Sequence, residues 1–140
     1  MGRELSFAVI PARFLITVGH VIALIMAFEF IPDSVYAGIG SSGNTVGKAS
    51  QSLTGAIWFG LICALIDLIG LFTGMTIFFV NNNLLQIIGH FAGCLCVSWF
   101  ITSTWPYYTM WNIVLITSLI PTAFEIWMFF AIFVLKVVVF

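Results

Sequence analysis

The chain has 140 residues, of which 62% are hydrophobic and 6% are charged, and its formal net charge is −1. Soluble domains carry about 25% charged residues, so this composition excludes a soluble fold. The sequence contains no cluster of basic residues, which argues against nucleic acid and against lipid capture by a polybasic segment.

Four apolar stretches are each long enough to cross a bilayer, which takes a helix of roughly 20 residues. They predict a single membrane domain over residues 1–140 and leave no room for a soluble catalytic domain. The first stretch covers about residues 11–31 and has one central ionisable side chain, His20. Arg13 lies near its entrance, where we expect the long side chain to extend toward lipid headgroups.

A polar segment, residues 32–52, follows the first span and is rich in glycine and serine. These residues make a chain flexible and supply little apolar surface on which it can fold. We therefore expect a linker here, with a loop that binds a partner as the alternative.

The second predicted span covers about residues 53–79 and carries one charge near its centre, Asp67. A carboxylate at mid-bilayer is expected to face protein or water rather than lipid. Small residues lie on the same stripe of the helix and should let a neighbouring helix approach closely. The stripe includes Gly60, Ala64, Gly70 and Gly74.

Three consecutive asparagines, Asn81–Asn83, predict a tight polar turn, so that the second and third spans form an antiparallel hairpin. The third span covers about residues 84–104 and has one buried ionisable residue, His90. Gly89 and Gly93 repeat the spacing that favours close helix packing.

The fourth predicted span covers about residues 111–135. Glu125 is its ionisable residue, and Pro121 should free a backbone carbonyl and kink the helix. Aromatic side chains cluster around the turn before this span, where anchoring at the membrane interface is expected and a ligand-binding cage is the alternative. They are Trp99, Trp105, Tyr107, Tyr108 and Trp111.

Each span thus contributes one ionisable residue to a predicted intramembrane polar layer: His20, Asp67, His90 and Glu125. Counted at 1.5 Å per helical residue, all four fall within roughly 10 Å of depth. Such a layer fits interhelical contacts that fix helix packing, a proton or ion relay, haem ligation by two histidines, or a docking site for another membrane protein.

Catalytic, cofactor and metal sites are not predicted. The sequence contains no Cys-x-x-Cys, Gly-x-Ser-x-Gly, His-Glu-x-x-His or phosphate-loop motif. His90 and Cys94 lie four residues apart but lack further donors at matching spacing, so no metal is expected.

The predicted fold class is all-α, an up-down antiparallel four-helix transmembrane bundle. The basic residues Arg3, Arg13 and Lys136 flank the spans near the two ends of the chain, against Lys48 in the first loop. An even number of spans puts both termini on one side, and the bias of basic residues predicts that this side is cytoplasmic.

An ordered set of short motifs resembles the transmembrane protein 107 family over nearly the whole chain. The set comprises Met1-Gly2-Arg3, Pro11-x-Arg13-Phe14-Leu15, His20, Asp67-Leu68-x-Gly70-x-x-Thr73-Gly74, Ile88, His90 and Pro121-x-x-x-Glu125. The resemblance implies a multi-pass protein of the ciliary transition-zone membrane, with both termini cytoplasmic. It also implies a role in the Meckel-syndrome module, which supports ciliogenesis and controls entry of membrane proteins to the cilium.

The sequence therefore favours a non-enzymatic scaffold or barrier subunit. The partners that the resemblance implies are tectonic-type and other transition-zone membrane proteins, with self-association left open. The alternative is a small transporter or proton relay that uses the four ionisable residues. A water-filled track between them would favour transport, and a closed dry layer would favour the scaffold.

Overall fold

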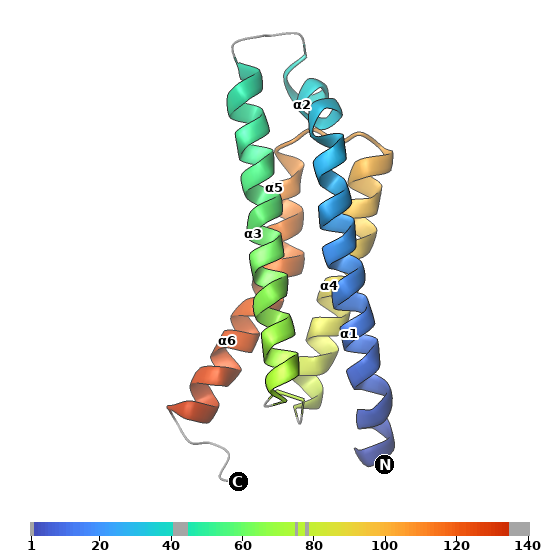
Figure 1. Ribbon diagram of the computed structural model, residues 1–140, viewed down its shortest axis with the longest axis vertical. Helices are drawn as coiled ribbons and strands as arrows, with labels where there is room; N and C mark the ends of the chain where they lie inside the picture. Colours follow the sequence, from blue (N-terminus) through green and yellow to red (C-terminus); the bar gives the residue numbers. More distant parts are fainter. Residues whose placement is uncertain (1, 41–44, 75, 78, 135–140) are drawn as a thin grey trace.

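The computed structural model describes the backbone of residues 2–40, 45–74, 76–77 and 79–134, and the side chains from residue 8 onward within these ranges. The chain forms an elongated bundle of antiparallel helices, and no strand occurs among the described residues (Figure 1). Four helical segments in this part of the chain are long and apolar enough to cross a membrane: Ala8–Ile39, Val46–Thr73, Val80–Thr102 and Thr109–Phe133. The prediction of an all-α, four-span fold is confirmed.

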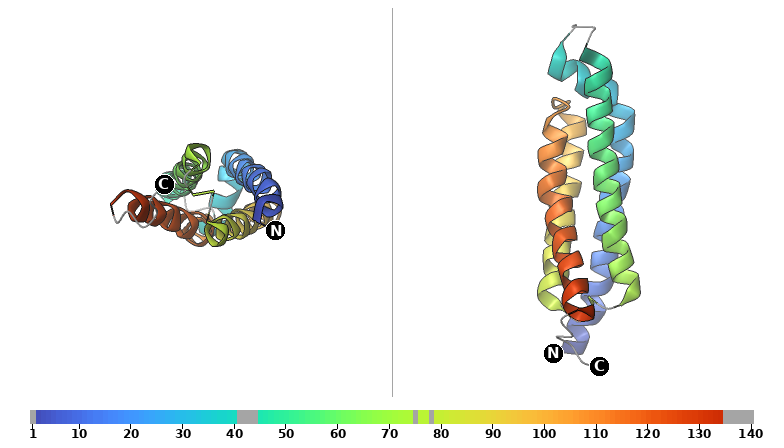
Figure 2. Two further views of the ribbon diagram at one scale, coloured as in Figure 1. Left: turned by 90° about the horizontal axis from the view of Figure 1, so that it is seen from below. Right: turned by 90° about the vertical axis from the view of Figure 1, so that its left-hand side faces the viewer.

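The first segment comprises α1 (Gly2–Ala27), a 3₁₀ turn η1 (Phe28–Phe30) and α2 (Ile31–Ile39). The next two segments are single helices, α3 (Val46–Thr73) and α4 (Val80–Thr102). The fourth comprises α5 (Thr109–Val114), a π-helical turn η3 (Leu115–Leu119) and α6 (Ile120–Phe133). Figure 2 shows these rods side by side, with the start of α1 and the end of α6 at the same end of the bundle.

Most of the predicted polar linker at residues 32–52 is helical, so that prediction was wrong at both of its ends. Pro32 occupies the first turn of α2, where its missing N–H removes no helical hydrogen bond. Tertiary contacts hold α2: Val35 is buried, and the Tyr107 N–H donates to the Ser34 carbonyl at 3.1 Å. Residues 41–44 of the predicted linker lie outside the described residues.

The second span ends earlier than predicted, because Gly74 adopts a positive φ of 74° and caps α3 in the left-handed conformation. Glycine tolerates this conformation without strain, and it is the common helix stop. A Cβ atom on Gly74 would meet no described residue within 4 Å, so the predicted packing role of Gly74 was wrong.

The turn between α3 and α4 also differs from the prediction. It precedes Val80, and Asn82 and Asn83 instead lie buried in the first turns of α4. Asparagine is frequent in turns because its side chain bonds the backbone, but here the tertiary partners of the two amides prevail.

The predicted irregularity at Pro121 is present: a π-helical turn, η3, comes just before this residue, and α6 leans outward from the bundle (Figure 1). Proline cannot donate a backbone hydrogen bond, and π-turns of this kind accommodate such interruptions. Residues 135 and 136, the predicted end of the span and the terminal lysine, lie outside the described part of the chain.

The interior has two zones. At the end where α2 lies, the core is apolar, and its largest fully buried side chains include Leu24, Leu53, Ile57, Phe100 and Met110. Toward the end where α1 starts and α6 ends, the buried side chains are polar or charged. That second zone contains the four ionisable residues that the sequence singled out.

Candidate functional site

The four predicted ionisable residues come from four different helices and all lie inside the bundle. His20 is on α1, Asp67 on α3, His90 on α4 and Glu125 on α6, and each is at most 1% exposed. The Nδ1 atoms of His20 and His90 lie 2.9 Å apart, and His90 Nε2 lies 3.1 Å from Asp67 Oδ2. We refer to these four residues, with Arg13, Thr76, Asn82, Asn83, Gln86 and Thr122, as the polar layer.

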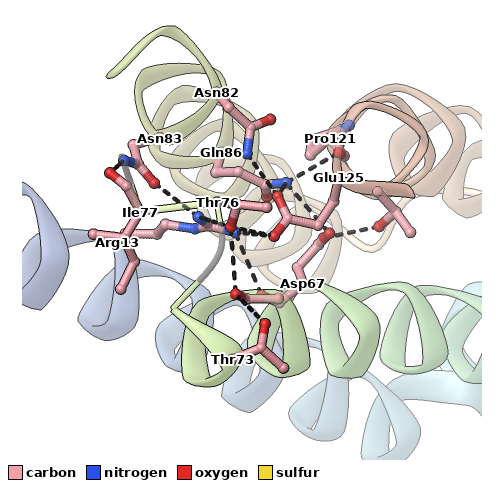
Figure 3. Close-up of polar contacts among 12 residues, drawn as sticks. Arg13, Asp67, Thr73, Thr76, Ile77, Asn82, Asn83, Gln86, Pro121 and Glu125 are labelled. Atoms are coloured by element: carbon pink, nitrogen blue, oxygen red, sulfur yellow. Dashed lines mark hydrogen bonds and ion pairs between the residues drawn. The ribbon is translucent and has the colours of Figure 1, made fainter. Parts of the chain in front are cut away.

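Both carboxylate oxygens of Glu125 have partners, which come from α1, from α4 and from the connection between α3 and α4 (Figure 3). Its Oε1 lies 3.1 Å from Arg13 Nη2 and accepts from the Thr76 hydroxyl at 2.6 Å. Its Oε2 accepts from Asn82 Nδ2 at 2.7 Å and from Gln86 Nε2 at 3.3 Å. This set of donors, including a guanidinium, is one that stabilises an ionised carboxylate.

Arg13 is 1% exposed, so the prediction that it extends toward lipid headgroups was wrong. Besides Glu125, its guanidinium donates to Asn83 Oδ1 at 2.8 Å and to Thr76 Oγ1 at 3.3 Å. A buried guanidinium is stable only when its charge and its several N–H groups find partners. Here the Glu125 carboxylate on α6 and the Asn83 amide on α4 are those partners. These interior contacts outweigh the contact with lipid headgroups that the sequence predicted.

Asp67 lies between the histidines and Glu125. Its Oδ2 accepts from the Thr122 hydroxyl at 2.8 Å, and its Oδ1 accepts from Gln86 Nε2 at 3.3 Å. Gln86 also reaches Glu125, and its Nε2 lies 3.0 Å from the Pro121 carbonyl. Gln86 therefore connects the two carboxylates, and contacts of 3.3 Å or less lead from His20 through His90 and Asp67 to Glu125.

Apart from Gly74, the predicted small residues face other helices of the same chain, and they let polar side chains and neighbouring helices come close. A Cβ on Gly70 would collide with the Glu125 carboxylate, and one on Gly93 would lie 2.5 Å from the His20 ring. Gly89 gives Pro121 room in the same way, and Gly60 lies against Leu24 and Val114. Ala64, also in the predicted stripe, is fully buried.

Sequence reasoning missed the other six members of the polar layer: Arg13, Thr76, Asn82, Asn83, Gln86 and Thr122. A signal existed for Arg13, which shares a helical stripe with His20 seven residues later. Asn82, Asn83, Gln86 and His90 likewise fall on one face of α4. Thr76 lies between two helices, and nothing in its local sequence indicates burial.

Among the described residues, no group of three or more His, Cys, Asp or Glu side chains is arranged to hold a metal ion. The cysteines are free: Cys63 is buried, and Cys94 and Cys96 are partly buried. Chemically, the polar layer can pair buried charged groups and lock four helices in register.

Four apolar helical segments joined by an interior polar layer define a multi-pass helical membrane protein. The model of the TMEM107 family, described as a transmembrane protein, matches residues 9–129 of the chain. The chain belongs to this family.

Known proteins of this family match this chain over most of its length. Transmembrane protein 107 of Danio rerio is 28% identical over 123 residues, which cover 86% of this chain and 91% of that protein. Transmembrane protein 107 of Rattus norvegicus is 28% identical and that of Homo sapiens 26% identical, each over 138 residues and 97% of both chains. No solved structure matches the chain.

Proposed function

We propose that this protein is a non-enzymatic scaffold or barrier subunit in the membrane of the ciliary transition zone. In this role it supports ciliogenesis and controls the membrane protein composition of the cilium as part of the Meckel-syndrome module. The observation that carries the proposal is membership of the TMEM107 family over residues 9–129. Apart from Met1-Gly2-Arg3, the residues that carry the sequence resemblance, among them Arg13, His20, Asp67 and Glu125, fall within that range.

The geometry of the polar layer supports a structural role. Arg13, His20, Asp67, His90 and Glu125 are each at most 1% exposed, and their contacts join α1, α3, α4 and α6. Hydrogen bonds between buried side chains of different helices are what a packing device needs, whereas a conduit needs water or substrate to reach its ionisable groups. We therefore place the layer in the interior of a rigid subunit.

The proposed partner contacts do not involve the small-residue stripes of α3 and α4. Gly60, Gly70, Gly89 and Gly93 already face groups of this chain, so the glycine stripes are occupied from within. The outward surface of α6 instead carries large exposed apolar side chains, including Phe124, Trp127 and Phe133. In lipid, helices associate through van der Waals packing, and large side chains on an outward-leaning helix offer such a surface to tectonic-type and other transition-zone membrane proteins.

The test replaces one member of the polar layer and one acidic residue outside it. Asp67→Leu removes the acceptor of His90, Gln86 and Thr122, whereas Asp33→Leu changes an exposed residue of α2. In ciliated cells we expect the Asp67 variant to lose crosslinked transition-zone partners and the Asp33 variant to keep them. Normal amounts of protein and normal recovery of partners for Asp67→Leu would contradict the proposal.

A second candidate, proton relay, is favoured by the row of contacts from His20 through His90 to Asp67, which the Gln86 amide links to Glu125. Acids and histidines in series are the residue types that pass protons in membranes. Protein reconstituted in vesicles distinguishes the two functions. A scaffold produces no proton flux above that of empty vesicles, whereas flux that disappears in Glu125→Gln would establish the relay.

A further inference from the structure

In their ordinary ionised states, the arginine and the two carboxyl groups of the polar layer carry unequal numbers of positive and negative charges. Arg13 on α1 contributes one positive charge, while Asp67 on α3 and Glu125 on α6 contribute one negative charge each. With both histidines neutral, the layer would hold one uncompensated negative charge in a region where these side chains are at most 1% exposed. An unbalanced charge in such surroundings is strongly unfavourable.

No other charged group is placed to correct this imbalance among the side chains that the structure describes. Glu29, Asp33 and Lys48 are exposed and belong to η1, α2 and the start of α3, at the apolar end of the bundle (Figure 1). The remaining titratable groups near the layer are two thiols, Cys63 on α3 and Cys94 on α4, which are uncharged in their ordinary state. Within the part of the chain whose side chains are described, a bound proton is the remaining source of balance.

The hydrogen-bond donors around the acids decide where that proton lies. Glu125 faces an arginine, a hydroxyl and two amide N–H donors, and Asp67 faces a hydroxyl, an amide N–H and a histidine nitrogen. Groups that donate to both oxygens of a carboxylate favour its ionised form. The histidine pair is therefore the better place for the proton.

We propose that His20 and His90 together form a buried proton-binding site, in which His90 is an imidazolium ion. Its Nε2–H donates to Asp67 Oδ2, and its Nδ1–H donates to the bare Nδ1 of neutral His20. The bound proton makes two positive and two negative charges in the layer, so that the buried charges balance.

The unpartnered atom of the pair is consistent with this assignment. His20 Nε2 is buried without a hydrogen-bond partner, and the His20 ring lies against Gly93. With Nδ1 accepting from His90, the His20 proton must be on Nε2, where it lacks an acceptor. One unsatisfied N–H is less unfavourable than one unbalanced ionic charge at the same depth, so the charged pair prevails.

Two other arrangements of protons are compatible with the same contacts. In the first, no extra proton is bound, His90 carries its proton on Nε2, and His20 donates from Nδ1. In the second, the extra proton sits on Asp67 and both histidines are neutral. Both leave two ring nitrogens without a proton, whereas the proposed pair leaves one.

The experiment counts these protons directly by solid-state nuclear magnetic resonance of ¹⁵N-histidine-labelled full-length protein in phosphatidylcholine bilayers. The chain has two histidines, so four ring nitrogens account for the whole signal. At about pH 7, we expect three protonated nitrogens and one bare nitrogen, with the bare one on His20. Two bare nitrogens would overturn the proposal.

Two variants locate the cause of the protonation, and Asp33→Asn, which changes an exposed side chain of α2, is the control. Asp67→Asn removes one negative charge, so the imidazolium should disappear and two nitrogens should become bare. His20→Gln keeps an acceptor for His90 Nδ1–H, so both nitrogens of the remaining ring should stay protonated. An imidazolium that persists in Asp67→Asn would contradict charge balance as the cause of the protonation, and so would a neutral His90 in His20→Gln. If Asp67→Asn does not fold, the His20→Gln variant still tests the proposal.

Discussion

The ion pair between Arg13 and Glu125 should be coupled strongly enough to measure. We consider two neutralising changes, Arg13→Met and Glu125→Gln, separately and together. Arg13→Met leaves the Glu125 charge buried with only the hydroxyl and amide donors of Thr76, Asn82 and Gln86. Glu125→Gln leaves the guanidinium buried without its carboxylate.

The distances set the expected magnitude. At the 3.1 Å that separates Nη2 from Oε1, opposite unit charges attract by about 5 kcal/mol for an effective dielectric constant of 20. Desolvation offsets much of this attraction, and removing one partner of a buried pair typically destabilises a protein by about 3–5 kcal/mol. The double variant leaves neither charge unpaired. It should therefore be less destabilised than the sum of the single variants, by roughly 2–3 kcal/mol.

The assay is reversible unfolding in mixed micelles, followed by the loss of helical circular dichroism as the fraction of sodium dodecyl sulfate rises. The free energies of unfolding of the four proteins form a double-mutant cycle. Strictly additive effects of the two substitutions would show that the pair contributes no interaction energy and would refute the reasoning. A double variant that is more destabilised than the sum would do the same.

Two further predictions use the same unfolding measurement. Gly70→Ala places a methyl group where the Glu125 carboxylate lies and should destabilise the protein by about 1–3 kcal/mol. The control is Gly55→Ala on the exposed face of α3, where the added methyl group meets its nearest atom at 3.9 Å. This control should be neutral or stabilising. A stabilising Gly70→Ala would contradict the observed packing. Thr122→Val removes the hydroxyl that donates to Asp67 and should destabilise by about 1–2 kcal/mol; an unchanged free energy would mean that this hydrogen bond is not made.

The four spans could be predicted from the sequence because long apolar runs have few stable structures other than membrane helices. Their ends were less predictable. Gly70 and Gly74 lie on one stripe, and the sequence alone does not distinguish their roles. Gly70 makes room for Glu125, whereas Gly74 ends α3. Which glycine takes which role depends on the position of α6, and that position is a tertiary property.

The acids and histidines of the polar layer could be predicted from the sequence, whereas its arginine, Arg13, could not. One ionisable residue per span is a clear pattern, because a titratable group inside a membrane helix needs a polar partner. Arg13 sits close enough to a span end that either headgroups or an interior carboxylate could satisfy it. The choice follows from Glu125, which is 112 residues away in sequence and approaches Arg13 only after α6 has packed.

The unequal distribution of polarity along the bundle explains how this chain specifies one arrangement of helices. Apolar helix surfaces gain little by leaving lipid for one another, so the core around Leu53 and Phe100 fills space with weak preference for register. The polar layer is more selective. Sliding α4 by one turn, about 5.4 Å, would separate His90 from Asp67 and Gln86 from Glu125 together, and would leave several polar groups unsatisfied. The polar end of the bundle therefore selects which helices meet and at what height, and the apolar end then packs around that choice.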